Sequence, residues 1–241
     1  MAMDRKSISI AVFGAGGRAG RAIVGEALRR GHHVVGVVRD PARYPGLADL
    51  GDGVTVVAGD LTDAGSVESV LSGISGMSGE ATAVVNAVTP FTAPPESFDD
   101  FDDDYYVHLV ENLSRAVVDR DCRVVEIGLF AMLKTSDVSR VYQDVVAFPE
   151  FLRPFAVARL RGLNAWGDQP DGVDWVVLSP PPGLASHTRS TGRYRLGDDV
   201  FDPQATVHLS YADLAVAVLD QIDTPTVHRC QAAVYGLAVG A

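Results

Sequence analysis

Closely spaced glycines follow a short apolar run near the start of the chain, where residues 8–20 read ISIAVFGAGGRAG. The apolar run is short and β-branched, as in a buried parallel strand, and residues 21–30 carry apolar side chains at helical spacing. A strand that turns sharply into a helix directs free backbone N–H groups and the positive end of the helix dipole at one point. The segment therefore predicts a cradle for the diphosphate of a dinucleotide.

Each glycine of this segment has its own expected role. Gly14 permits the turn, Gly17 permits close approach of a phosphate, and Gly20 lets the helix pack against the strand. Gly31 is expected to end the helix. A tight turn without a ligand is the competing interpretation of the glycines alone, but the order strand, helix, strand favours the cofactor site.

The rest of the chain alternates short apolar runs with amphipathic segments. We expect further strands at residues 34–38, 54–58, 83–88, 124–127 and 175–178, and helices at residues 64–72, 105–119 and 151–166. This alternation predicts a doubly wound α/β fold with a mostly parallel sheet. Ligands of such sheets bind outside the carboxyl ends of the strands, so the chemistry is expected in the loops that follow them.

The last third of the chain changes character. Residues 191–199 alternate as in a β-hairpin around a Gly-Asp turn, and Ser210 with Asp213 forms a capping-box pair for a helix through Gln221. A last strand is expected near residues 232–235. No repeat or low-complexity linker divides the chain, so we expect one domain over its whole length, in which the residues from about 183 to 241 form a small lobe on the substrate side.

Composition excludes several classes of function. The 241 residues are 47% hydrophobic, which suffices for a full core, and the net charge of −11 without a basic cluster opposes a nucleic-acid partner. Cys122 and Cys230 are too far apart in sequence to suggest a disulfide framework or a zinc site, and no metal-ligand spacing occurs. No apolar run approaches the ~18 residues of a membrane span, and no signal peptide is evident. We expect a cytoplasmic protein that acts on a small molecule.

The residues after the second expected strand bear on the choice of nicotinamide cofactor. An acid there would accept the ribose hydroxyls of NAD, whereas an arginine would pair with the 2′-phosphate of NADP. The last residue of that strand is Arg39, and Arg18 in the glycine loop is placed to approach the same phosphate, so we expect the two to converge and favour NADP over NAD. NAD is the alternative cofactor, because a strand one residue longer would bring the carboxylate of Asp40 to the ribose. Solvated surface charges are the alternative for both arginines.

Two later strand ends are expected to complete the cofactor site. Asp60, after the third strand, is placed to accept the exocyclic amine of adenine, and a helix-capping aspartate is its alternative. Asn86, Ala87 and Val88 end the fourth strand with small or medium side chains, as a backbone beside the ribose and nicotinamide requires. An ordinary core strand is the alternative for these three.

The chain resembles the atypical branch of the short-chain dehydrogenase/reductase superfamily, in the group of NmrA-like and flavin-reductase-like (biliverdin-reductase-B-like) NAD(P)H-binding proteins. The matching segments are GAGGRAG from Gly14, VRDP from Val38, GDLTD from Gly59 and NAV from Asn86, in order over roughly residues 7–180. The resemblance implies a Rossmann fold. The expected cofactor contacts are Gly14, Gly16, Gly17, Arg18, Ala19, Gly20, Arg39, Asp60, Leu61, Asn86, Ala87 and Val88. The chain departs from its relatives after the fifth strand, where GLFAM replaces small, glycine-rich residues.

The sequence lacks the Tyr-Lys pair that usually donates a proton in this superfamily. Typical members use a Tyr four residues before a Lys that lowers the pKa of the phenol. The lysines of this chain are Lys6 and Lys134, and Phe130 stands four residues before the second. Tyr142 has Val146 in place of a lysine and is interpreted as structural. Catalytic residues therefore stay unassigned.

Histidines and an acidic run offer weaker candidates. His108 could supply a proton near neutral pH, although a packing histidine is the preferred interpretation, and His187 and His208 have no assignable role. Residues 99–104 contain five aspartates, which we interpret as a solvated loop that favours the N-terminus of the next helix rather than as a cation site.

A reaction that needs little from protein acids suits these residues. The expected function is hydride transfer from NADPH to a flavin, a quinone or a similar small acceptor, with the second proton drawn from solvent. A non-catalytic NADPH-binding redox sensor is the alternative from another class, and an NAD-dependent epimerase-like enzyme is a third. The family resemblance alone does not decide among them.

Overall fold

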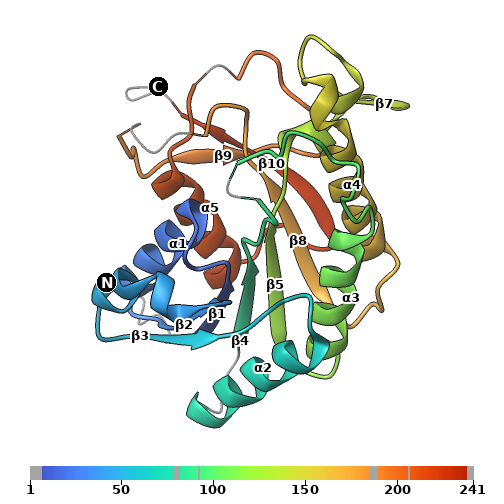
Figure 1. The fold of residues 1–241 in the computed structure, drawn as a ribbon. Coiled ribbons are helices and arrows are strands. Elements are labelled where there is room, and N and C mark those ends of the chain that lie inside the picture. Colours follow the sequence, from blue (N-terminus) through green and yellow to red (C-terminus); the bar gives the residue numbers. More distant parts are fainter. Residues whose placement is uncertain (1–6, 79–81, 92, 185–188, 206, 238–241) are drawn as a thin grey trace.

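Eight strands form one sheet in the spatial order β3-β2-β1-β4-β5-β8-β10-β9, and its neighbours are parallel except β9 with β10 (Figure 1). The computed structural model describes residues 7–78, 82–91, 93–184, 189–205 and 207–237. The strands are β1 Ser9–Phe13, β2 His33–Val38, β3 Val54–Ala58, β4 Thr82–Asn86, β5 Cys122–Ile127, β8 Asp174–Ser179, β9 Tyr194–Leu196 and β10 Cys230–Gly236. A separate antiparallel pair joins β6 Lys134–Ser136 to β7 Ser139–Arg140.

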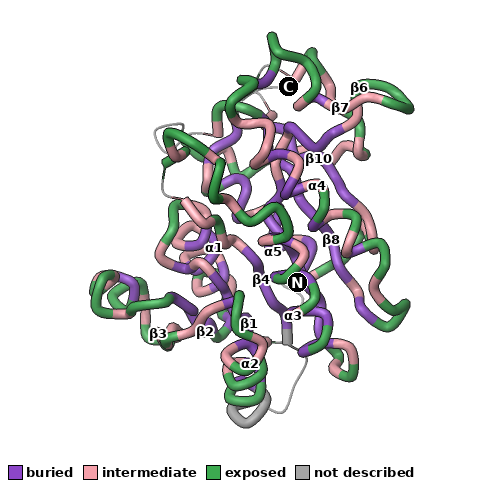
Figure 2. Tube along the Cα trace, turned by 45° about the vertical axis from the view of Figure 1, so that its right-hand side comes forward, coloured by how far each residue is buried: buried purple, intermediate pink, exposed green. Residues whose placement is uncertain are grey.

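Helices cover both faces of the sheet, as the apolar character of its strands requires. One face carries α1 (Arg18–Arg29) and α5 (Tyr211–Asp223), and the other carries α2 (Ala64–Ser78), α3 (Tyr105–Val117) and α4 (Arg153–Gly167). Short 3-10 turns span Pro41–Arg43, Pro45–Leu50, Phe130–Met132, Val141–Gln143 and Glu150–Leu152. Figure 2 shows the central strands buried along most of their length. None of the helices in the described ranges is long and apolar enough to cross a bilayer.

The doubly wound fold expected from the sequence is confirmed, and most elements differ from expectation only at their ends. Helix α1 begins at Arg18, so this residue occupies the first helical turn rather than the glycine loop. Strand β2 ends at Val38, so Arg39 follows it directly. Ser210 caps α5 as expected, because the Asp213 N–H donates to Ser210 Oγ at 2.9 Å. The second bond of the expected capping box differs, since the Ser210 hydroxyl donates to Asp213 Oδ2 at 2.8 Å.

The expected local hairpin at residues 191–199 is wrong. Strand β9 pairs instead with β10, which lies far along the chain, and Leu196 is opposite Val234. Alternating side chains predict a strand with one covered face, but they do not identify its partner. Strand β10 in turn lies parallel to β8, and α5 packs beside α1. Much of the expected lobe therefore belongs to the main sheet and its helical layer.

A buried group of charges joins α1 to α5 at the amino edge of the sheet. The Arg30 side chain is 5% exposed and contacts Glu26 at 2.7 Å, Asp220 at 2.8 Å and Asp223 at 2.8 Å. Burial opposes ionisation of Glu26, but hydrogen bonds from Arg29 and Arg30 outweigh it, so the pKa of this carboxyl lies below its ordinary value. The charged form of Glu26 therefore stabilises the fold.

Replacing Glu26 by glutamine is expected to lower the free energy of unfolding by about 1–2 kcal/mol at neutral pH. A lowered carboxyl pKa contributes stability above the unfolded-state value, and this contribution is lost as the pH falls through the folded-state value. The deficit of Glu26→Gln should therefore shrink in acid, as urea unfolding at several pH values would measure. Glu68→Gln, which removes a half-exposed partner of Arg120, is the control and should cost less. A deficit independent of pH would contradict the assignment.

Candidate cofactor site

The glycine loop between β1 and α1 lies at the carboxyl edge of the sheet, where β1 is flanked by β2 and β4. Gly14 has a φ of +80°, a conformation that side chains rarely adopt. A Cβ atom at Gly14 would also lie 2.7 Å from the carbonyl oxygen of Ala87. The end of β4 therefore contacts the loop directly, and Gly14 is required by the fold itself.

The next glycines have different neighbours. A Cβ atom at Gly20 would lie 2.2 Å from the Gly14 oxygen, so the expected close packing of helix against loop is present. A Cβ atom at Gly16 would lie 2.4 Å from the ring of Tyr44. Sequence analysis missed Tyr44, which covers this side of the loop from the segment after β2.

Gly17 is the exposed glycine of the loop and the N-cap of α1. A Cβ atom there would contact Gly14 oxygen alone, at 3.3 Å, and otherwise meet open space. The N–H groups of Arg18, Ala19 and Gly20 belong to the first turn, and among the described residues they have no acceptor. Free N–H groups beneath open space fit the diphosphate of a dinucleotide.

Arg18 and Arg39 have different neighbours in this structure. The guanidinium of Arg18 lies 5.5 Å from the ring centroid of Tyr211, at the start of α5. Arg39 lies near Tyr105, at the start of α3. Burial and the charge of Asp60 raise the pKa of Tyr105 to about 12, and the charge of Arg39 opposes this rise. Arg39 is thus the arginine near the expected adenosine end, and Arg18 points toward α5.

The acidic candidates make local contacts. Asp40 Oδ1 accepts the N–H of Ala42 at 3.1 Å, so this carboxylate is turned into the following 3-10 helix. Asp60 Oδ1 accepts the N–H of Thr62 at 2.9 Å, whereas the neighbouring Asp63 caps α2 through the Gly65 N–H at 2.8 Å. Helix capping therefore falls to Asp63.

The other cofactor candidates lie at strand ends. The Leu61 side chain is buried among α2 and α3, so only its main chain can face a ligand. The Ala87 N–H donates to the Phe13 oxygen at 3.0 Å, and Ala87 and Val88 are partly exposed. Asn86 is 1% exposed, and its Oδ1 accepts the Val88 N–H at 3.1 Å.

A buried carboxylate beneath this edge was missed by sequence analysis. Glu126, on β5, is 2% exposed and lies beside Asn86, Trp166 and Arg159. Burial raises the pKa of Glu126, while the nearby guanidinium of Arg159 and the hydrogen bonds from Trp166 and Asn86 lower it. A carboxylate within the apolar run of residues 124–127 was the available signal.

Helix α4 carries a second missed pair. Phe155 and Arg159 are four residues apart, the spacing of the Tyr and Lys of typical superfamily members. Arg159 Nη1 donates to the Ile127 oxygen at 2.8 Å, so the helix crosses the carboxyl end of β5 at this pair. Phe155 has no proton to donate, and Arg159 is 7% exposed. Tyr142 packs with Phe148 and Ala156, in agreement with its structural interpretation.

The remaining candidates are surface side chains, except one that the structure does not describe. His108 has a 54% exposed side chain that pairs with Asp102 at 3.3 Å, so the packing interpretation was wrong and it is a surface histidine. His208 is exposed, and His187 lies outside the described residues. Asp103 and Asp104 pair with Arg161 of α4, and the described part of the chain holds no cluster of three metal-ligating side chains.

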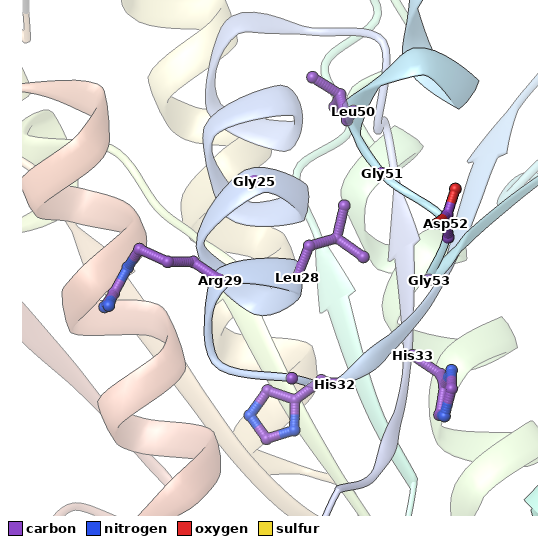
Figure 3. A pocket seen from close by; sticks show the side chains of 10 residues that line it. Gly25, Leu28, Arg29, His32, His33, Leu50, Gly51, Asp52 and Gly53 are labelled. Carbon is purple, nitrogen blue, oxygen red and sulfur yellow. The ribbon is translucent and has the colours of Figure 1, made fainter.

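Two cavities lie away from the glycine loop. One, of about 530 Å³, opens at the amino edge, where Leu28 points from α1 toward the segment with Asp52 and Gly53 (Figure 3). The other, of about 770 Å³, lies between α4, Lys134 and β10. Neither cavity is lined by residues of the glycine loop, so neither belongs to the candidate cofactor site.

The chain has relatives over nearly its whole length. The profile of the NAD(P)H-binding family matches residues 14–225. The uncharacterised protein YwnB of Bacillus subtilis (strain 168) is 26% identical over 226 residues, which cover 90% of this chain and 93% of that protein.

Solved structures show the same architecture. A protein proposed to be an NADH-flavin reductase, from Streptococcus pneumoniae TIGR4, is 22% identical, with a TM-score of 0.76 over 96% of this chain and 100% of that one. A protein proposed to be an epimerase, from Bacteroides thetaiotaomicron, is 27% identical, with a TM-score of 0.77 over 98% of this chain and 100% of that one.

The doubly wound sheet, with a glycine loop and a free helix N-terminus at its carboxyl edge, defines a Rossmann-type dinucleotide-binding protein. The chain belongs to the NAD(P)H-binding family, within the atypical short-chain dehydrogenases/reductases. A nicotinamide dinucleotide is accordingly its cofactor.

Proposed function

We propose that the protein is an NADPH-dependent reductase that passes hydride to a small planar acceptor, a flavin or a quinone. The observation that carries this proposal is the open space over Gly17 beside the unpaired N–H groups of α1, together with a sequence in which neither lysine has a Tyr four residues before it. The first feature supports binding of the cofactor, and the second restricts the chemistry.

The residues of the site divide between the two halves of the cofactor. The first turn of α1 would hold the diphosphate through its N–H groups, and Arg39 would pair with the 2′-phosphate as a forked donor. The main chain of Ala87 and Val88, at the end of β4, would line the nicotinamide half. When bound, NADPH supplies the hydride.

The acceptor follows from the missing acid. Reduction of a carbonyl to an alcohol needs a proton at the oxygen, and the Tyr-Lys pair that usually supplies it is missing from this sequence. A flavin or a quinone takes up hydride into a conjugated ring and receives its further proton from water, so no side-chain donor is required. Each turnover would oxidise one NADPH and reduce one acceptor by two electrons.

Purified protein tested for NADPH oxidation with FMN, FAD and several quinones should show turnover that requires both the protein and an acceptor. NADH should serve less well. Tight NADPH binding without turnover across this panel would contradict the reductase and favour a redox sensor. Acceptor-independent interconversion of a nucleotide sugar would favour an epimerase, to which the Bacteroides relative gives some support.

A further inference from the structure

A row of side chains crosses the α2–α4 face of the sheet just below its carboxyl edge. Adjacent registers place Asn86 of β4 beside Glu126 of β5. The Asn86 Nδ2 group donates to Glu126 Oε2 at 3.1 Å, and the Trp166 indole N–H donates to the same oxygen at 3.0 Å. The other carboxylate oxygen, Oε1, lies 3.5 Å from Arg159 Nη1. Both oxygens of Glu126 therefore face donors.

These groups are held too deeply to touch a ligand. Glu126 is 2% exposed, and the guanidinium of Arg159 lies 4.1 Å from the centroid of the buried Tyr106 ring. Removing one partner of such a pair leaves a buried charge without compensation, which is strongly destabilising. Any role in binding must therefore pass through a buried neighbour whose main chain continues into the site.

Asn86 is that neighbour. An Asn side chain has nearly the same shape with its oxygen and nitrogen exchanged, so its hydrogen-bond partners select the orientation. Glu126 Oε2 accepts from Nδ2, which holds that group toward β5 and leaves Oδ1 toward the Val88 N–H at 3.1 Å. With the amide turned over, an NH₂ group would face that N–H and the contact would be lost.

The segment from Asn86 to Val88 adjoins the glycine loop. Ala87 follows Asn86, its N–H donates to the Phe13 oxygen, and its own oxygen is the group that forbids a Cβ atom at Gly14. The orientation of the buried Asn86 amide thus affects the position of the main chain after β4, which contacts the glycine loop.

We infer that Glu126 is a positioning residue, which orients Asn86 and thereby sets the main chain of Ala87 and Val88 against the nicotinamide half of the cofactor. This inference rests on the proposed function. It assigns Glu126 no contact with the cofactor and no proton transfer.

The test compares two ligands in binding titrations: NADPH, and 2′-phospho-ADP-ribose, which lacks the nicotinamide. Glu126→Gln keeps the shape of the side chain, but its single oxygen cannot accept from Asn86 and Trp166 on one side and from Arg159 on the other. The variant should bind NADPH about 5- to 10-fold more weakly and bind 2′-phospho-ADP-ribose within about twofold of the wild-type affinity. The fluorescence of bound NADPH should also shift toward that of free NADPH. Equal loss for both ligands, or no loss for either, would overturn the inference.

A second variant keeps the test decisive if Glu126→Gln folds poorly. Asn86→Ala removes the link itself and should show the same selective loss for NADPH, and adding Glu126→Gln to it should cause little further loss. Additive losses would show that Glu126 does not act through Asn86.

Asp223→Asn is the matched control, because Asp223 is a buried carboxylate paired with Arg30 at the opposite edge of the sheet. It should lower stability without discriminating between the two ligands. Failure of the wild-type protein to bind either ligand would instead refute the proposed function.

Discussion

Replacing Arg39 by alanine is expected to weaken NADPH binding about 10- to 100-fold and to leave NADH binding nearly unchanged, since a charge-assisted pair is worth about 1.5–3 kcal/mol. Arg39 follows β2 directly, on the side of the site that also holds Asp60 and Tyr105. The extra 2′-phosphate of NADPH is the one group that would use this charge. Titration of each coenzyme by calorimetry measures both affinities.

Arg115→Ala is the control for the Arg39 substitution. Arg115 is an exposed arginine in the last turn of α3, toward the amino edge of the sheet, so its removal changes the net charge equally. It should leave both affinities as they are. Equal losses of affinity for NADPH and NADH on replacing Arg39 would refute its pairing with the 2′-phosphate. That result would favour Asp40 as the ribose ligand and a preference for NAD.

Replacing Gly17 by valine is expected to abolish measurable binding of both coenzymes, a loss of roughly 100-fold or more if a buried diphosphate contact is blocked. The branched side chain would fill the open space above the first turn of α1. The backbone of Gly17 is extended, with φ −73° and ψ 170°, a conformation that valine adopts readily. The variant should therefore fold, which thermal unfolding would verify alongside the titrations.

Gly25→Val is the matched control, because it makes the same change in the same helix. A Cβ atom at Gly25 meets nothing within 4 Å, and the residue lines the cavity at the amino edge. This variant should bind both coenzymes normally. Undiminished binding in Gly17→Val would mean that the glycine loop serves the fold alone.

Gly14 is a poor choice for such an experiment. Its positive φ and its contact with the Ala87 oxygen mean that a side chain there would disturb the loop and the end of β4 together. Loss of binding would then report loss of structure. The sequence predicted a turn at Gly14 and close approach at Gly17, but the contact between Gly14 and the Ala87 oxygen is seen only in the structure.

Local patterns were sufficient for most of the fold. Strand β3 begins and ends where its apolar run does, and Ser210 caps α5 through the Asp213 N–H as their spacing predicts. In both cases the interactions that decide the outcome lie within a few residues of one another. The same reasoning placed β9 correctly as a strand but gave it the wrong partner, because pairing depends on residues far along the chain.

The sequence by itself determined the alternating architecture, the glycine loop and the family, because each depends on side chains a few positions apart. The tertiary structure decided that Arg18 lies over Tyr211, which aspartate caps α2, and that Asn86 and Arg159 meet Glu126 beneath the carboxyl edge. Those contacts join β4, β5 and α4, elements brought together only when the sheet assembles. The direction of a charged side chain and the partner of a buried one depend on this packing, whereas the period of an apolar pattern does not.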